Sequence, residues 1–132
     1  MNIQLVKTEN FNDITCDFYS ADDQLWMSRQ QIGLALEYKD PRVAIAKIHD
    51  ANKERLDRDS VVTKLETTDG KSYSSYIYNE RGIYEICRRS RQPKADAFMD
   101  WVWDVIGAYR HGKLRTGTPV TTVEQFLTEQ TE

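Results

Sequence analysis

The spacing of apolar positions changes several times along the chain, and each change predicts a new element. Residues 3–6 form a short apolar stretch, and residues 14–19 alternate between apolar and polar side chains. Alternation with a period of two is typical of a half-buried strand. Residues 21–24 have the character of a turn and residues 25–27 are apolar again, so the pattern predicts a β-hairpin near the N-terminus.

Two short helices are predicted next. Ser28 and Gln31 have the spacing of a capping box, which predicts a helix from Ser28 to about residues 37–39. Asp40 and Pro41 match the cap and the first position of a second helix. The pair predicts a helical hairpin similar to a helix-turn-helix. We expect the second helix to bury Val43, Ala44, Ile48 and Ala51.

A second hairpin follows a polar segment. Residues 52–60 predict a helix end and a loop, whereas residues 61–67 and 72–78 are strand-like. Asp69-Gly70 between these strands is a strong signal for a tight turn. Strand alternation divides the second strand into two faces, one with Tyr73, Ser75 and Ile77 and the other with Ser74, Tyr76 and Tyr78.

Two further helices complete the pattern. Asn79 is expected to cap the first, whose inner side carries Ile83, Ile86 and Cys87. Residues 88–92 predict a basic turn, Pro93 the start of the last helix, and Gly112 its end. The cleanest helical period in the chain predicts that this last helix anchors the core through Phe98, Trp101, Val102, Val105 and Tyr109.

These elements predict an α+β fold with short β-hairpins packed against a helical hairpin and a long C-terminal amphipathic helix. We expect one domain over residues 1–113 and an acidic tail over residues 114–132, in which residues 120–127 could form one weak helix. The chain has 132 residues, 39% of them hydrophobic, which suits a single core. The most apolar segments fall well short of the ~20 residues of a membrane span, and no secretory signal is visible. We therefore expect no membrane association.

Composition indicates where the protein is located in the cell and shows that charge is distributed unevenly along the chain. Cys16 and Cys87 stand outside any paired motif, which favours reduced thiols over a disulfide and predicts a cytoplasmic protein. The net charge of −3 hides a segregation: residues 28–115 contain 17 basic and 13 acidic side chains, whereas both ends are acidic. The basic middle is therefore where a polyanion would bind.

Two basic clusters are candidates for phosphate contacts. The first comprises Arg81, Arg88, Arg89, Arg91 and Lys94. Guanidinium groups match phosphate oxygens, and a helix start at Pro93 would add anion-binding amides. The second comprises Arg29, Lys39, Arg42 and Lys47. Arg42 lies in the first turn of its predicted helix, where recognition helices meet base edges, and Gln30 and Gln31 have side chains suited to adenine.

Each cluster also has a structural interpretation as ordinary solvated charge. That interpretation is favoured for Lys53, Arg55 and Arg58, because acidic residues are interspersed among them. Asp96, Asp100 and Asp104 recur every fourth residue, which predicts a solvent-facing stripe rather than a metal site. His49 and His111 are isolated, so we expect no metal, no cofactor and no enzymatic activity. Trp103 lies off the apolar stripe and is a candidate partner-binding residue, or it packs under the N-terminal hairpin.

Several spaced motifs resemble one family. The segments are Asn79-Glu80-Arg81-Gly82-Ile83-Tyr84, Arg89-Ser90-Arg91-Gln92-Pro93-Lys94-Ala95 and Phe98-x-x-Trp101-Val102, preceded by Trp26-Met27 and by residues 36–45. Together they resemble the N-terminal domain of BRO proteins, found in baculoviruses and in phage or prophage antirepressors. The resemblance covers about residues 10–113, and one departure is Glu37, where the family usually has glycine.

The resemblance implies an α+β domain that binds double-stranded DNA and regulates phage or prophage genes in the bacterial host. The alternative is a protein-interaction module that inhibits a repressor or host factor without touching DNA. Many family members carry a second, C-terminal domain, and the sequence leaves open whether this chain is a fragment of such a protein. It also leaves open the preferred DNA sequence, the protein partner and any oligomer.

Overall fold

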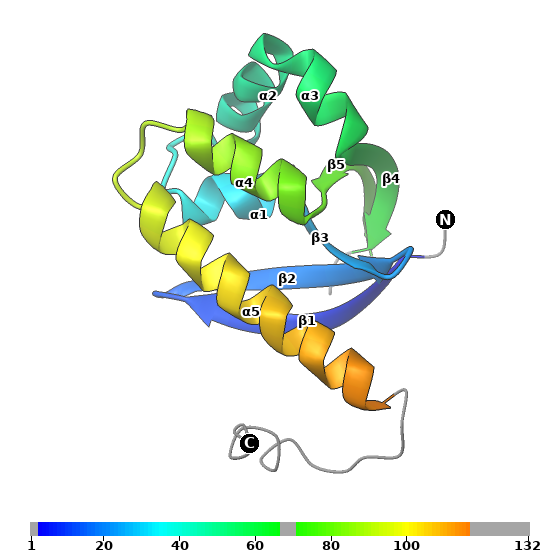
Figure 1. Cartoon of the computed structure of the whole chain (residues 1–132). Helices are drawn as coiled ribbons and strands as arrows, with labels where there is room; N and C mark the ends of the chain where they lie inside the picture. The colour runs from blue at the N-terminus through cyan, green and yellow to red at the C-terminus, as the bar shows by residue number, and fades with distance from the viewer. Residues whose placement is uncertain (1–2, 67–70, 117–132) are drawn as a thin grey trace. The chain divides into compact units, whose positions relative to one another are not determined.

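The computed structural model describes residues 3–66 and 71–116, which form a mixed α+β fold (Figure 1). The elements in chain order are β1 Gln4–Phe11, β2 Ile14–Ala21, β3 Gln24–Ser28, α1 Arg29–Ala35, α2 Pro41–Ala51, α3 Lys53–Arg58, β4 Ser60–Glu66, β5 Ser72–Tyr78, α4 Glu80–Arg89 and α5 Ala95–Thr116. The predicted class is therefore confirmed. The chain divides into two compact units, Met1–Trp101 and Val102–Glu132, with the boundary inside α5.

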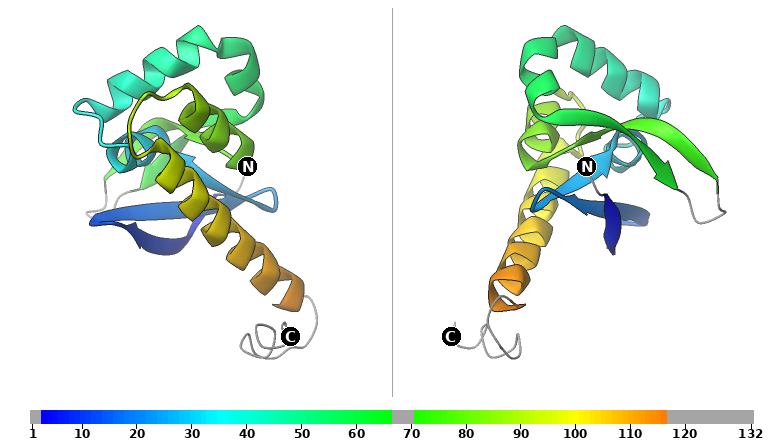
Figure 2. Two further views of the ribbon diagram at one scale, coloured as in Figure 1. Left: turned by 60° about the vertical axis from the view of Figure 1, so that its left-hand side comes forward. Right: turned by 90° about the vertical axis from the view of Figure 1, so that its right-hand side faces the viewer.

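All five strands of the described part join one antiparallel sheet in the order β1-β2-β3-β5-β4. Strand β3 changes its partner along its length. Its first three residues pair with β2, whereas Met27 and Ser28 pair with Tyr78 and Ile77 of β5. Figure 2 shows the β4–β5 ladder extending beyond the helices. Strand β1 is longer than the segment predicted at residues 3–6. The sequence pattern missed its full length because β1 is largely exposed and has no regular alternation of apolar and polar residues.

Tight turns with positive φ connect the first three strands. Asn12 has φ 57° between β1 and β2, and Asp22 and Asp23 have φ 52° and 61° between β2 and β3. Two successive positive φ angles define the hairpin turn whose twist matches that of the flanking strands. Asn and Asp tolerate this region better than other non-glycine residues, so the turn predicted at residues 21–24 is confirmed.

Helices cover one face of the sheet: α1 contacts β2, β3 and β5, while α4 contacts β3 and β5. Aromatic rings fill the space next to β1 and β2. The ring of Phe98 lies 5.2 Å from that of Phe11, and Trp101 lies 5.8 Å from Phe18. Phe98 and Trp101 therefore anchor the start of α5, as the sequence predicted. Farther along the helix, Val102 and Val105 are buried.

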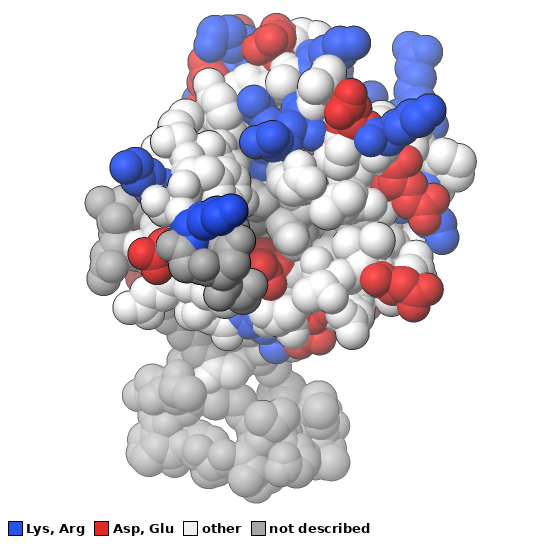
Figure 3. Space-filling model, turned by 180° about the vertical axis from the view of Figure 1, so that it is seen from behind, with Lys and Arg blue, Asp and Glu red and all other residues white. Residues whose placement is uncertain are grey.

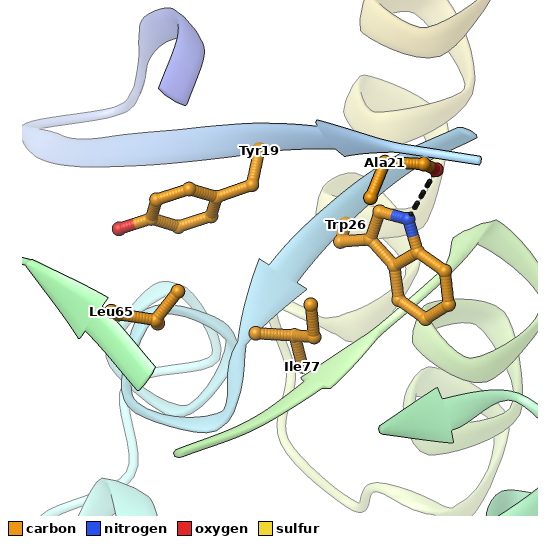
Figure 4. Packing of buried hydrophobic residues seen from close by; sticks show 5 residues of the cluster. All are labelled: Tyr19, Ala21, Trp26, Leu65 and Ile77. Carbon is orange, nitrogen blue, oxygen red and sulfur yellow. Dashed lines mark hydrogen bonds between the residues drawn. The ribbon is translucent and has the colours of Figure 1, made fainter. Parts of the chain in front are cut away.

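A second apolar cluster lies on the other side of the β2–β3 hairpin (Figure 4). Tyr19, Ala21 and Trp26 meet Leu65 of β4 and Ile77 of β5 there. The indole Nε1 of Trp26 donates a hydrogen bond of 2.9 Å to the carbonyl oxygen of Ala21, so the buried polar edge of the ring is satisfied. This cluster joins the two halves of the sheet that β3 connects.

The buried face of α2 differs from the prediction. Val43 is 48% exposed and Ala51 is exposed, whereas Ile45 and His49 are buried. The prediction left His49 out of the buried face of α2, although the structure buries it. Its imidazole has hydrogen-bond partners inside the protein, which stabilise a rotation of α2 that leaves Val43 outside.

Other predicted boundaries are corrected by the structure. Residues 53–58 form the helix α3 instead of a loop, and α4 continues through Arg89, so Arg88 and Arg89 belong to its last turn. Helix α5 begins at Ala95 instead of Pro93 and passes Gly112 without stopping. The predicted turn at Asp69-Gly70 and the weak helix at residues 120–127 lie outside the described residues.

Helix caps are confirmed in part. Ser28 accepts a hydrogen bond from the backbone N–H of Gln31, and Asn79 accepts one from Gly82. Gln31 does not return to Ser28, because its Oε1 accepts a hydrogen bond from the backbone N–H of Asp17 at 2.7 Å and ties α1 to β2. Asp40 occupies the cap position of α2 without a side-chain bond to the helix.

The end of α1 has the geometry of a Schellman motif with Glu37 in the left-handed position. The N–H of Tyr38 donates to the carbonyl of Gly33, the N–H of Glu37 donates to that of Leu34, and Glu37 has φ 67°. Glycine usually occupies this position, since a Cβ is strained there. Gly33 is needed as well, because a Cβ on it would lie 2.6 Å from the Cα atom of Pro41.

We expect Glu37→Gly to raise the free energy of unfolding by about 1 kcal/mol, because glycine adopts a positive φ without strain. Urea denaturation of the wild type and the variant measures the change. Glu37→Ala is the matched control, because it removes the same charge and keeps the strained conformation. Equal stabilisation by both substitutions would show that the charge of Glu37, and not its backbone, is unfavourable.

Candidate functional site

A buried polar network joins α1, α2 and β5. The hydroxyl of Tyr78 lies 2.8 Å from Nδ1 of His49 and accepts hydrogen bonds from Nε and Nη2 of Arg29 at 3.1 and 2.9 Å. The other imidazole nitrogen, Nε2, lies 2.7 Å from Oδ1 of Asp57. Tyr78 and His49 are 0% and 1% exposed, so their polar atoms need partners inside the protein. The contacts above supply a partner for the hydroxyl and for both imidazole nitrogens.

The direction of these hydrogen bonds follows from their chemistry. Burial raises the pKa of Tyr78 to about 12, although the hydrogen bond and the charge of Arg29 act against this rise. The hydroxyl therefore keeps its proton at neutral pH. Arg29 has only donors, so Tyr78 accepts from Arg29 and donates to Nδ1 of His49, whose Nε2–H then donates to Asp57. One consistent set of donors fixes the orientation of α2.

This network changes the role of Arg29. Its guanidinium stacks over the ring of Tyr76 at 4.0 Å from the centroid and is half-buried. We predicted from the sequence that Arg29 contacts DNA. In the structure, its Nε and Nη2 groups instead lie within hydrogen-bond distance of Tyr78 and His49. Arg29 and Arg42 line one shallow hollow of about 390 Å³, together with Val43, Ala46 and residues 74–76 of β5.

The outer side of α2 carries two cations that have no acidic partner in the described part of the chain. Arg42 and Lys47 are exposed, and neither forms an ion pair within residues 3–66 and 71–116. The same is true of Lys39 in the turn before the helix. The structure thus brings together three of the four predicted residues of this cluster on one helix and its leading turn.

The segment between α4 and α5 carries basic side chains and also binds the end of α1 and the turn that follows it. The side-chain amide of Gln92 donates to the carbonyl oxygens of Leu36 and Glu37 at 2.9 and 3.1 Å, which caps the end of α1. The hydroxyls of Tyr38 and Ser90 lie 2.9 Å apart. Between these contacts Arg91 is exposed, whereas Lys94 lies 3.9 Å from Glu37. Only part of the predicted cluster is therefore open to a ligand.

An arginine pocket lies between α3 and α4. It has a volume of about 190 Å³ and is lined by Arg55, Arg58, Asp59, Arg81, Tyr84, Glu85 and Arg88. From the sequence we predicted that Arg81 and Arg88 belong to one phosphate-binding cluster and that Arg55 and Arg58 are ordinary solvated charge. The arginine pocket shares no residue with the hollow beside α2, so the predicted cations line separate surfaces.

Glu85 holds several of these arginines in place. Its Oε1 lies 3.2 Å from Arg88 and 3.7 Å from Arg55, and its Oε2 accepts hydrogen bonds from Arg89 at 2.7 Å. Burial acts to raise the pKa of Glu85, but the hydrogen bond and charge of Arg89, with the charges of Arg55 and Arg88, outweigh it and hold the pKa below its usual value. The pocket therefore favours negative charge.

Figure 3 shows one face of the molecule, where Lys and Arg side chains gather mainly over the half that contains α2 and α3, with acidic side chains between them. Sequence reasoning missed Arg55, Arg58, Glu85 and His49. The arginines at a spacing of three in α3 were a usable signal once that segment was taken as helical. No local pattern marked Glu85 or His49 as buried.

The structure also places the other residues that the sequence singled out, which are a tryptophan, three aspartates and two cysteines. Trp103 is 65% exposed, and Asp96, Asp100 and Asp104 are exposed, as predicted for a solvent-facing stripe. Cys16 and Cys87 are buried free thiols. Among the described residues, no group of three or more His, Cys, Asp or Glu is placed to hold a metal ion. Within the same ranges no helix is both long and apolar enough to cross a membrane.

The family model of the BRO family N-terminal domain matches residues 15–107. This match covers most of the chain, and the chain therefore belongs to the BRO family through this domain. Searches of the curated proteins and of the solved structures found no match. Membership points to a DNA-binding regulatory class of protein.

We expect Glu85→Gln to lower the free energy of unfolding at pH 7 by about 2 kcal/mol, because it removes charge-assisted hydrogen bonds to arginine. The folded-state pKa of Glu85 lies below its ordinary value of 4.5. Its contribution is therefore complete above pH 4.5 and is lost as the pH falls through the lower, folded-state pKa.

Urea denaturation at pH 7 and at pH 3 measures this effect, and the difference between wild type and Glu85→Gln should narrow at pH 3. Asp100→Asn is the control, since Asp100 is exposed. An equal difference at both pH values would mean that the carboxylate charge of Glu85 contributes nothing.

Proposed function

We propose that this chain is a double-stranded DNA-binding regulator of the phage antirepressor type, which acts without catalysis in the cytoplasm of the bacterial host. Family membership supports the class. The observation that carries the proposal is the outer side of α2, where Arg42 and Lys47 are exposed and no carboxylate in the described ranges pairs with them. Exposed cations of this kind are what a polyanion needs for binding.

The shape and chemistry of α2 suit the major groove of DNA. A groove about 12 Å wide admits one helix, and residues near the N-terminus of such a helix reach base edges. Arg42 occupies the first turn and matches the two acceptors of guanine. Val43 next to it is 48% exposed, and an apolar side chain there suits the methyl group of thymine.

The other cations are assigned to the phosphate backbone in this proposal. Lys39, Lys47 and Arg91 are exposed, and each has a flexible side chain suited to a non-specific contact. Arg29 acts as a positioning residue, because its contacts with Tyr76 and Tyr78 hold β5 next to α1, and its Nη2 also lies 3.3 Å from Nδ1 of His49 on α2. Regulation follows if this chain, when bound to DNA, excludes a repressor from the same DNA site.

We expect two exposed residues of α2 to give different results when substituted. Lys47→Ala should reduce the magnitude of the negative slope of log affinity against log salt by about 0.9 on mixed-sequence duplex DNA, because one phosphate contact is lost. Arg42→Ala should relax base preference at one position among duplexes selected from a random pool, because a base contact is lost. Fluorescence anisotropy and selection with sequencing provide the two measurements.

Lys64→Ala is the matched control for charge, because Lys64 is exposed on β4 and also has no ion pair in the described part. It should leave both the salt slope and the base preference unchanged. A wild-type chain that shows no salt-dependent affinity for duplex DNA would reject the proposed function.

A second candidate function is supported by Trp103, whose side chain is 65% exposed. Large exposed aromatic side chains are common in protein interfaces, so the domain would instead bind and inhibit a repressor protein without contacting DNA. In that case Trp103→Ala should abolish co-purification of the repressor and leave duplex affinity unchanged. Asp100→Ala is the control, and retention of the repressor by Trp103→Ala would exclude this residue as the anchor.

A further inference from the structure

The arginine pocket between α3 and α4 contains more positive charge than its own carboxylates neutralise. Arg55, Arg58, Arg81 and Arg88 line it, against the two carboxylates of Asp59 and Glu85. We propose that this pocket is a binding site for one phosphate group, carried by a nucleic-acid strand or by a free nucleotide. The site is separate from the surface of α2, because the two share no lining residue.

The count of hydrogen-bond donors supports a ligand in the pocket. Each guanidinium has five N–H groups, and Glu85 takes one donor from Arg88 and lies within ion-pair distance of one nitrogen of Arg55. Arg58 donates from Nε to the carbonyl oxygen of Glu54 at 3.4 Å, and Arg81 forms no ion pair within the described residues. Many donors around the pocket thus have no acceptor among the residues that the structure describes, and a phosphate supplies several acceptor oxygens at once.

The walls of the pocket are held in position before any ligand binds. Glu85 fixes Arg55 of α3 and Arg88 of α4 by binding both through Oε1. At the other wall the backbone N–H of Asn79 donates to the carbonyl of Asp59 at 3.1 Å. Gly82 permits this approach, because a Cβ there would lie 2.8 Å from that carbonyl oxygen. Preorganised arginines lose less side-chain freedom on binding than free ones do.

The size and charge of the pocket favour phosphate over a carboxylate ligand. A volume of about 190 Å³ holds a phosphate group together with part of the molecule that carries it. Arginines from two helices can engage oxygens that point in different directions, which a tetrahedral phosphate offers and a planar carboxylate does not. The charges of Arg55 and Arg88, together with Arg89 beside the pocket, also hold the pKa of Glu85 below its usual value, which agrees with a site for negative charge.

The experiment is an NMR titration of the full chain with inorganic phosphate, with deoxythymidine monophosphate and, at matched ionic strength, with acetate. We expect saturable shifts of the backbone amide signals of Gly82 and Tyr84 with both phosphates. Arg58→Gln combined with Arg81→Gln should weaken this binding at least tenfold, because it removes two lining cations that do not pair with Glu85. Circular dichroism confirms that the variant is folded.

Lys64→Gln combined with Lys71→Gln is the matched control, since it removes the same charge from exposed positions that line neither the arginine pocket nor the hollow beside α2. Its phosphate affinity should stay within twofold of the wild type. The proposal is overturned if the wild type shows no saturable shift, if acetate binds as tightly as phosphate, or if the control variant loses as much affinity as the pocket variant.

Duplex DNA titrations with the same proteins identify the source of the phosphate. A loss of duplex affinity in the pocket variant beyond that in the control supports a site for a backbone phosphate. Unchanged duplex affinity with lost nucleotide binding supports a site for a free nucleotide. If the wild type binds phosphate but no duplex, the proposed DNA-binding function fails and the pocket stands.

Discussion

The buried hydroxyl of Tyr78 is the constraint on which the arrangement of α1, α2 and β5 depends. A polar group that is 0% exposed must find partners inside the protein, since an unsatisfied one costs about 1–3 kcal/mol. Its partners are Arg29 on α1 and His49 on α2, and His49 is bound in turn by Asp57 on α3. Satisfying one hydroxyl therefore fixes the rotation of α2, and that rotation decides that Arg42, Val43 and Lys47 face outward.

The charges of the domain are organised in two different ways. On α2 the cations are exposed and without acidic partners in the described part, which suits contacts that form only when a polyanion arrives. Between α3 and α4 the arginines are gathered by the buried Glu85, which holds guanidiniums from both helices in fixed positions. A single carboxylate under several arginines does not neutralise them. It draws Arg55 and Arg88 toward one point and leaves the pocket with more arginines than carboxylates.

The motifs that reveal the family are largely structural. Ser90 and Gln92, in the most distinctive segment, bind the turn between α1 and α2 through Tyr38 and through the last carbonyls of α1. Gly33 allows that turn to form, and Glu37 adopts the positive φ that its Schellman geometry demands. Such residues identify the fold because backbone geometry tolerates few alternatives. They do not by themselves identify a ligand, and the residues for which we propose ligand contacts lie largely outside these motifs.

The sequence by itself determined the α+β class, most strands and helices, two of the helix caps and the aromatic anchor at Phe98 and Trp101. These features follow from local periodicity and from short-range hydrogen bonds, which adjacent residues specify. Only the tertiary structure decided that His49 and Glu85 are buried and that Arg55 and Arg58 join Arg81 and Arg88 in one pocket. The reason is that the energy of burying a polar or charged group depends on partners that lie far away in the chain, as His49 depends on Tyr78 and Glu85 on Arg55.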